Sequence, residues 1–152
     1  PVKIDYRVYA GSAQTRFLNG LAEGRLLGQR CPECKKVYLP PRGACPRCGV
    51  ATEEEVECAD TGTVTTFCIV NLPFSATVRD IPYVCASVLL DGADIPLFGL
   101  IQEVEVEQVR MGMRVRAVWA DPEDMLPTLE TIKYFKPSGE SDAPYESYRE
   151  HL

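Results

Sequence analysis

The chain has 152 residues, 45% of them apolar, and a formal net charge of −6. This length suffices for one domain or two small ones, and no apolar run is long enough to span a membrane. Residues 1–50 carry nine Lys or Arg against three Asp or Glu, whereas residues 51–152 carry seven against nineteen. This asymmetry indicates separate roles for the two halves, and ordinary solvated surface charge is an equally weighted alternative.

Residues 1–24 are predicted to form an extended leader and a helix. Ser12 is a suitable N-cap, and Phe17 and Leu21 would share one apolar face of the helix. We expect the helix to end before Gly24, because glycine commonly follows the last helical turn.

Two C-x-x-C pairs separated by ten residues dominate residues 25–51 and predict a zinc ribbon. Paired thiolates at this spacing supply the four ligands of a tetrahedral zinc ion, and a closed thiolate shell holds structure together without doing chemistry. The alternatives are two disulfides or four unrelated buried thiols. The expected ligands are Cys31, Cys34, Cys45 and Cys48.

The residues around the two cysteine pairs favour tight metal-binding turns. Gly49 follows the second pair and can adopt the positive φ that such turns need. Lys35 stands at the matching place after the first pair and would adopt that conformation at some cost. No signal peptide is visible, so we expect reduced thiols and a cytoplasmic location.

Residues 52–136 change to a β-rich pattern and predict a closed barrel. Residues 53–58 are expected to bridge the ribbon and the barrel. Strands with turn residues between them, and without a strong helix, are typical of a small barrel of the oligonucleotide/oligosaccharide-binding (OB) type. The predicted strands are residues 61–70, 83–90, 95–101, 113–119 and 131–135. The fold class is therefore mostly β: an N-terminal helix, a rubredoxin-like zinc ribbon and a five-stranded OB barrel.

Residues 137–152 are predicted to be a flexible tail, because they begin with a loose, Pro- and Ser-containing segment and continue as a polar stretch. A segment that orders on a partner is the alternative. Outside the ribbon, Cys58, Cys68 and Cys85 lie in strand-like segments and are expected to be buried thiols. The single histidine, His151, makes a Cys–His catalytic dyad improbable.

The N-terminal half resembles the domain of unknown function 35 family. The resemblance rests on Arg30 before the first cysteine pair, on Pro40, Pro41 and Arg42 between the pairs, and on Gly49 after the second pair. It covers about residues 12–136, and the Pro-Pro-Arg run is its most specific part. The glycine that commonly follows the second cysteine of the family's motif is replaced here by lysine.

The resemblance implies an accessory subunit of thiolase-fold enzymes in acyl-CoA metabolism. Some family members stand between a thiolase and a condensing enzyme, and others join a lipid-transfer-type thiolase homologue to form an aldolase that shortens steroid side chains. The chain is similar to the latter kind, in which the chemistry lies in the thiolase-fold subunit. We expect a hetero-oligomer with two copies of each chain, an acyl-CoA at or near the interface, and neither nucleic acid nor membrane as a partner.

The basic N-terminal half suits the phosphates of CoA, since Arg side chains pair with phosphate oxygens in a bidentate manner. For any single basic residue near the ribbon, solvated surface charge is the better explanation. Arg42 is the strongest candidate because two prolines precede it and restrict its backbone. The candidates near the ribbon are Arg30, Lys35, Lys36, Arg42 and Arg47.

Two other functions compete with the accessory role. Zinc ribbons and OB barrels both occur in nucleic-acid-binding proteins, but the net charge of −12 on residues 51–152 would repel phosphates. An independent enzyme would need acid–base groups, for which the carboxylates from Asp121 to Asp124 are the candidates. A solvated acidic loop explains this cluster better, because no nucleophile or base accompanies it.

Overall fold

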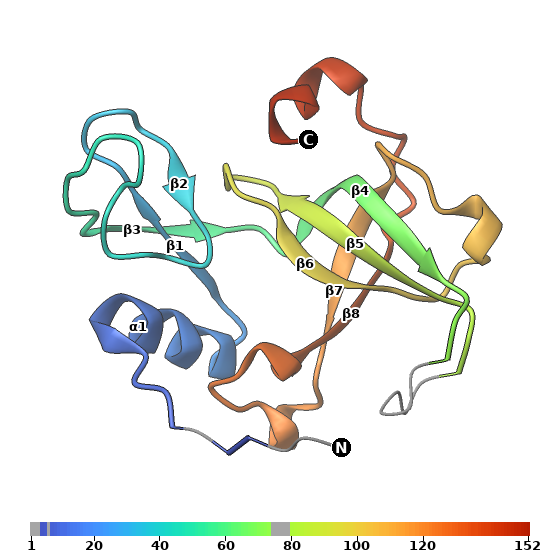
Figure 1. Cartoon of the computed structure of the whole chain (residues 1–152), viewed down its shortest axis with the longest axis horizontal. Helices are drawn as coiled ribbons and strands as arrows, with labels where there is room; N and C mark the ends of the chain where they lie inside the picture. The colour runs from blue at the N-terminus through green and yellow to red at the C-terminus, as the bar shows by residue number, and fades with distance from the viewer. Residues whose placement is uncertain (1–3, 6, 74–79) are drawn as a thin grey trace.

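The structure, a computed structural model, describes residues 4–5, 7–73 and 80–152. Within them, one α-helix is followed by eight strands and several short 3₁₀ helices (Figure 1). The mostly-β fold class that the sequence predicted is confirmed. The helix and strands are α1 (Gly11–Ala22), β1 (Leu26–Arg30), β2 (Val37–Tyr38), β3 (Glu54–Cys58), β4 (Thr61–Val70), β5 (Tyr83–Leu90), β6 (Leu97–Ile101), β7 (Arg114–Trp119) and β8 (Ile132–Pro137).

The ribbon contains a three-stranded antiparallel sheet in the order β2-β1-β3. Residues 53–58, expected from the sequence to bridge the ribbon and the barrel, instead contain β3. This strand pairs with the whole of β1, from Leu26 opposite Cys58 to Arg30 opposite Glu54. Such a pairing joins segments far apart in sequence, so local composition does not reveal it.

The barrel closes in the order β4-β5-β6-β8-β7. Its ends meet where Thr61 of β4 lies opposite Arg116 of β7, and β6 meets β8 through one parallel pair, Ile101 and Phe135. Gly99 permits this packing, because a Cβ atom there would lie 2.7 Å from the ring of Phe135. The connectivity is that of a five-stranded OB barrel.

Helix α1 packs on the ribbon side of the molecule through its apolar face (Figure 1). Phe17 and Leu21 are fully buried, as the predicted helical face requires. The expected N-cap role of Ser12 is wrong, because the helix begins two residues earlier than such a cap requires, at Gly11, with Ala10 as N-cap and no side-chain capping bond. Gly24 takes a positive φ of 72° directly after the helix.

One apolar core joins the helix, the ribbon and the barrel. It includes Leu21 of the helix, Leu39 of the ribbon and Val64 of β4. A polar clamp adds to this contact: the backbone N–H of Val37 donates to the Asp94 carboxylate at 2.8 Å, and the Asp94 N–H donates to the Val37 carbonyl at 2.9 Å. The ribbon is therefore fixed to the loop between β5 and β6.

The C-terminal segment, predicted to be flexible, is folded against the barrel in the structure. Tyr148 is 5% exposed, the Ala143 N–H donates to the Gly112 carbonyl, and Nδ1 of His151 donates to the Asp94 carbonyl at 3.0 Å. Burial of an aromatic ring offsets the entropy lost on ordering the segment. In the described part of the chain, no helix is long and apolar enough to cross a membrane.

Candidate metal centre

The structure brings together the four cysteines of the two C-x-x-C pairs. Their Sγ atoms all lie within 4.8 Å of one another, and the sulfur atoms of Cys34 and Cys45 are 3.7 Å apart. A zinc–sulfur bond of about 2.3 Å implies tetrahedral sulfur–sulfur edges of about 3.8 Å. The spacing and the donor chemistry therefore fit one tetrahedral thiolate-bound metal ion.

The first cysteine turn is held by backbone bonds around Cys31. Its carbonyl accepts from the Lys35 N–H at 3.1 Å, its N–H donates to the Lys36 carbonyl at 2.9 Å, and its sulfur accepts from the Cys34 N–H at 3.5 Å. Lys35 has a φ of 64°, the left-handed conformation that we expected at this position.

The second cysteine turn repeats the geometry of the first around Cys45. Here the Gly49 N–H donates to the Cys45 carbonyl at 2.9 Å and the Cys45 N–H donates to the Val50 carbonyl at 2.8 Å. The Cys45 sulfur accepts from the Cys48 N–H at 3.4 Å, and Gly49 has a φ of 71°. The two turns present their thiols to a common point because their backbones are alike.

Tyr38 contributes an interaction that the spacing of the cysteines did not indicate. Its side chain is buried beside the cysteine cluster, and its hydroxyl lies 3.2 Å from the Cys45 sulfur. The hydrogen bond from this hydroxyl favours the thiolate and lowers the pKa of Cys45 to about 6. A lowered pKa favours the ligand form of the cysteine, because metals bind the thiolate.

The basic residues proposed as phosphate contacts differ in their surroundings. Arg30 lies 3.4 Å from the carboxylate of Glu54, and its Nε is buried without a hydrogen-bond partner. The Lys35 ammonium donates to the Pro32 carbonyl at 2.7 Å. The side chains of the other candidates form no ion pair or hydrogen bond with any described residue. These are Lys36, Arg42 and Arg47.

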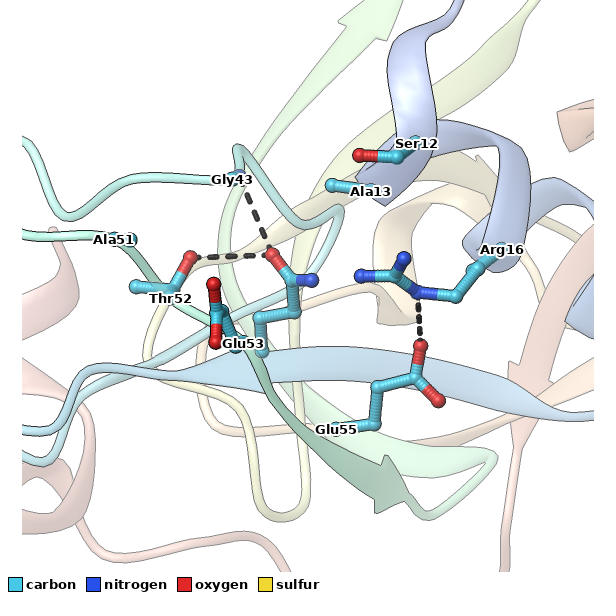
Figure 2. Close-up of a pocket in the computed structure, with 9 residues that line it drawn as sticks. Ser12, Ala13, Arg16, Gly43, Ala51, Thr52, Glu53 and Glu55 are labelled. Carbon is cyan, nitrogen blue, oxygen red and sulfur yellow. Dashed lines mark hydrogen bonds and ion pairs between the residues drawn. The ribbon is translucent and has the colours of Figure 1, made fainter.

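A polar pocket of about 650 Å³ lies between α1, β1, β3 and the loop before the second cysteine pair (Figure 2). Arg16 from the helix reaches the carboxylate of Glu55 across it. Gln29 is 2% exposed, and its side-chain oxygen accepts from the Gly43 N–H and the Thr52 hydroxyl. This pocket could not be predicted from the sequence, because its lining comes from four separate segments.

The three cysteines outside the ribbon do not share the expected burial. Cys58 is buried, and burial raises the pKa of its thiol to about 11. Cys85 is half-buried, whereas Cys68 is exposed. The expectation of burial is therefore wrong for Cys68, because the second half of β4 extends beyond the strand segment that pairs with β7.

The acidic loop was the candidate site of an independent enzyme, and exposed aromatic residues of the barrel would be needed for nucleic-acid binding. In the acidic loop, Asp121 forms an ion pair with Lys133, while Glu123 and Asp124 are exposed to solvent. Among the aromatic residues of the barrel, Phe135 is fully buried and Phe98 is 71% exposed. Phe67 of β4 is also exposed, at 36%.

Two family models match the chain in succession. The model described as ChsH2, rubredoxin-like zinc ribbon domain, matches residues 18–54. The model described as ChsH2, C-terminal OB-fold domain, matches residues 55–120. The order of the two matches is the order of the ribbon and the barrel in the structure.

Two curated proteins are similar in sequence. A DUF35 domain-containing scaffold protein of Methanocaldococcus jannaschii is 38% identical over 96 residues, covering 62% of this chain and 67% of that protein. A probable enoyl-CoA hydratase alpha subunit of Thermomonospora curvata is 35% identical over 105 residues, covering 68% of this chain. The match spans 32% of the hydratase subunit.

Two solved structures share the fold. The Ltp2-ChsH2(DUF35) aldolase contains a chain that is 26% identical, with a TM-score of 0.65 over 87% of this chain and 99% of that one. A protein of unknown function from the DUF35 family of Sulfolobus solfataricus is 19% identical, with a TM-score of 0.64 over 84% of this chain and 87% of that one. The sequence matches and the shared ribbon-and-barrel architecture show that this chain belongs to the DUF35 family.

Proposed function

We propose that this chain is a non-catalytic accessory subunit that binds a thiolase-like enzyme of the lipid-transfer type. The observation that carries the proposal is the similarity to the Ltp2-ChsH2(DUF35) aldolase, which extends over 99% of that chain. The description of the Methanocaldococcus relative as a scaffold protein supports a role in assembly. The complex would contain two copies of each chain, because most oligomers are symmetric and thiolase-fold enzymes are typically dimers.

The reaction that the pair would perform is cleavage of a carbon–carbon bond in an acyl-CoA. We infer retro-aldol cleavage in steroid or lipid side-chain degradation, with the reacting groups supplied by the partner enzyme. The accessory subunit would help to close the partner's active site over the substrate. Such closure excludes water and holds the reacting atoms in place. We expect the complex to catalyse this reaction in the cytoplasm.

The cysteine cluster would hold one zinc ion in a structural role. Four thiolate ligands complete a tetrahedral shell, so a bound zinc would stabilise the ribbon and present no open position to a substrate. Cys31 and Cys45 are buried and the other two ligands are more exposed, which leaves an entry path for the ion. The energy of metal binding would contribute directly to folding of the ribbon.

The unpaired basic side chains beside the ribbon would contact the phosphates of CoA. Arg42 and Arg47 are exposed and form no ion pair with a described residue, so neither would have to break an existing bond to bind a phosphate. A planar guanidinium can donate two parallel hydrogen bonds to a phosphate. Lys36 and Arg30 would add positive charge nearby.

A scaffold that links a thiolase to a condensing enzyme is a second candidate. The Methanocaldococcus relative is described as a scaffold protein, which favours this candidate. Nucleic-acid binding is less favoured, because residues 51–152 have a net charge of −12 and phosphate repulsion would weaken binding along the barrel.

Co-expression with a thiolase-like enzyme of the lipid-transfer type tests the proposal. We expect the two proteins to purify as one complex and to cleave an acyl-CoA only as a pair. A partner that is fully active alone and does not bind this chain would contradict the accessory role. Measuring both thiolysis and retro-aldol cleavage separates the two kinds of partner.

A further inference from the structure

The outward face of β4, β5 and β6 carries an unusual set of side chains. Thr66 lies opposite Ser87 and Cys68 opposite Cys85, while Ser87 and Cys85 lie opposite Phe98 and Leu100 of β6. Alternation along each strand places these six residues on one side of the sheet. We call this surface the uncharged face, because it contains no Asp, Glu, Lys, Arg or His side chain.

The rest of the molecule makes this absence of charge distinctive. Charged residues make up 25% of the chain. On the opposite side of the barrel, Arg116 of β7 lies opposite Lys136 of β8, and three of the five residues of β3 are glutamates. Other β surfaces of this chain therefore carry charged side chains. Forming part of a β sheet does not by itself explain why this face has none.

The uncharged face is accessible and adjoins a hollow. Phe98 is 71% exposed, and Cys68 is exposed. A hollow of about 580 Å³ begins beside Leu100, and the charged residues Glu130 and Lys133 line its other side. A large exposed aromatic side chain such as Phe98 is of the kind that protein interfaces use as an anchor.

The edge of β4 beside this face is also open. Pairing between β4 and β7 ends at Thr63, so no described strand pairs with the outer edge of β4 from Thr66 to Val70. Charged side chains and proline usually protect an exposed edge strand from pairing with another chain. These residues include neither. The edge can therefore accept backbone hydrogen bonds from an extended segment of another protein.

We propose that the uncharged face is the surface on which the partner enzyme docks. This inference rests on the proposed function and names the surface of this chain that meets the partner. The centres of protein interfaces are depleted in charged residues and enriched in aromatic ones. Docking here would remove no ionised side chain of the face from water, so the cost of desolvation is small.

Charge distinguishes the partner enzyme from other occupants. Two copies of this chain each carry a net charge of −6 over the whole molecule, and like net charges disfavour association. Nucleic acids and anionic lipid surfaces are recognised by clustered Lys and Arg, which the face lacks. The occupant is therefore a different protein with an apolar, uncharged docking patch.

Cys68 provides a reporter on the face without any substitution. The zinc-loaded chain, alone and in the co-expressed complex, is treated with iodoacetamide, and modification of each cysteine is followed by peptide mass spectrometry. We expect alkylation of Cys68 to slow at least about tenfold in the complex, because a docked surface excludes the reagent. Cys58, buried in the chain itself, should react slowly in both samples.

The result that would overturn the docking surface is a complex in which Cys68 reacts as fast as in the isolated chain. In that case the complex exists and the proposed function stands, but the partner meets another surface. Protection of Cys68 in the isolated chain at twice its monomer mass would assign the face to a second copy and also overturn the inference. Absence of any complex would refute both the proposed function and the docking surface.

A charge substitution gives an independent measurement. Phe98→Lys should weaken binding of the partner at least about tenfold, because it places an unpaired ammonium in the centre of the interface. Tyr9→Lys is the matched control, since Tyr9 is 86% exposed and lies in the leader before α1. Equal affinity of the Phe98→Lys variant and the parent chain would contradict the inference.

Discussion

Arg42 is the single residue on which the proposed contact with CoA most depends. It follows two prolines, is exposed, and forms no ion pair or hydrogen bond with a described residue. We expect Arg42→Gln to raise the KM of the complex for acyl-CoA about fivefold to tenfold, because a phosphate loses a charged donor. Steady-state kinetics of the purified complex measure this effect.

The control for that substitution is Arg149→Gln. Arg149 lies in the C-terminal segment, where it pairs with Glu146. An unchanged KM in both variants would show that Arg42 does not contact CoA. That result would not bear on the association of the two proteins.

Arg114 joins two ion pairs on the barrel. Its side chain is 15% exposed and binds the carboxylates of Asp91 and Glu140. The guanidinium lowers the pKa of Asp91, and the Ser138 hydroxyl together with Arg114 lowers the pKa of Glu140. We expect Arg114→Met to reduce the free energy of unfolding by about 1–3 kcal/mol at neutral pH.

The pH dependence of that loss has a defined sign. Because the folded pKa values lie below the ordinary values of 3.8 and 4.5, the stabilisation is fully present above the unfolded pKa values. It is lost as the pH falls through the lower folded values. Urea unfolding between about pH 7 and pH 3 should show the parent chain and the variant converging in acid, and a constant difference would contradict this account.

At the scale of an element, the two cysteine turns form a natural comparison. Lys35 and Gly49 occupy equivalent positions with φ values of 64° and 71°. Lys35→Gly should stabilise the ribbon by about 1 kcal/mol, because glycine adopts this conformation without the cost that a Cβ imposes. Gly49→Ala should destabilise it by a similar amount.

Competition with a zinc chelator, together with urea unfolding, measures both effects. Thr15→Gly, at an exposed position in the middle of α1, is the control in which glycine should destabilise. A loss of stability in Lys35→Gly would show that the bond from the lysine ammonium to the Pro32 carbonyl outweighs backbone strain.

The ribbon as an element should depend on its metal. Cys48→Ser removes one ligand and should release zinc, with loss of β2 and the cysteine turns, because metal-binding energy is folding energy in such modules. Zinc content by atomic absorption and backbone NMR spectra of the ribbon measure the result. Cys68→Ser serves as the control, because Cys68 lies outside the cluster. Full zinc content in Cys48→Ser would contradict the assigned ligand set.

Tyr148 supplies a buried aromatic ring to the contacts that hold the C-terminal segment. Tyr148 is buried, and a Cβ added at Gly112 would lie 3.3 Å from its hydroxyl. Tyr148→Ala should therefore release the segment and cost about 2–4 kcal/mol of unfolding free energy. Tyr145→Ala, at a residue 54% exposed, should cost less. Equal hydrogen-exchange rates after residue 143 in Tyr148→Ala and the parent chain would contradict a packed tail.

At the scale of the whole molecule, local patterns predicted more than long-range contacts. The residue ranges of β4 and β5 follow directly from runs of β-branched and apolar residues, and the spacing of the cysteines anticipated their cluster. The pairing of β3 with β1 and the burial of Tyr148 were not predicted, because both depend on segments distant in sequence. Ser12 shows a related limit, since a good capping residue does not decide where a helix begins.

The same limit applies to the functional surfaces. The cysteine cluster has a fixed spacing that a sequence reveals. The pocket around Gln29 and the uncharged face each combine residues from several strands, and their composition becomes visible only when the register is known. The sequence therefore indicated a ribbon and a barrel, whereas surfaces that combine residues from several strands become visible only in the structure.

Native mass spectrometry of the chain co-expressed with a thiolase-like enzyme would test the accessory role, because one spectrum reports the partner, the stoichiometry and the bound metal. We expect a complex with two copies of each protein and one zinc ion for each copy of this chain. Two separate proteins, each at its own mass under conditions that preserve complexes, would contradict it.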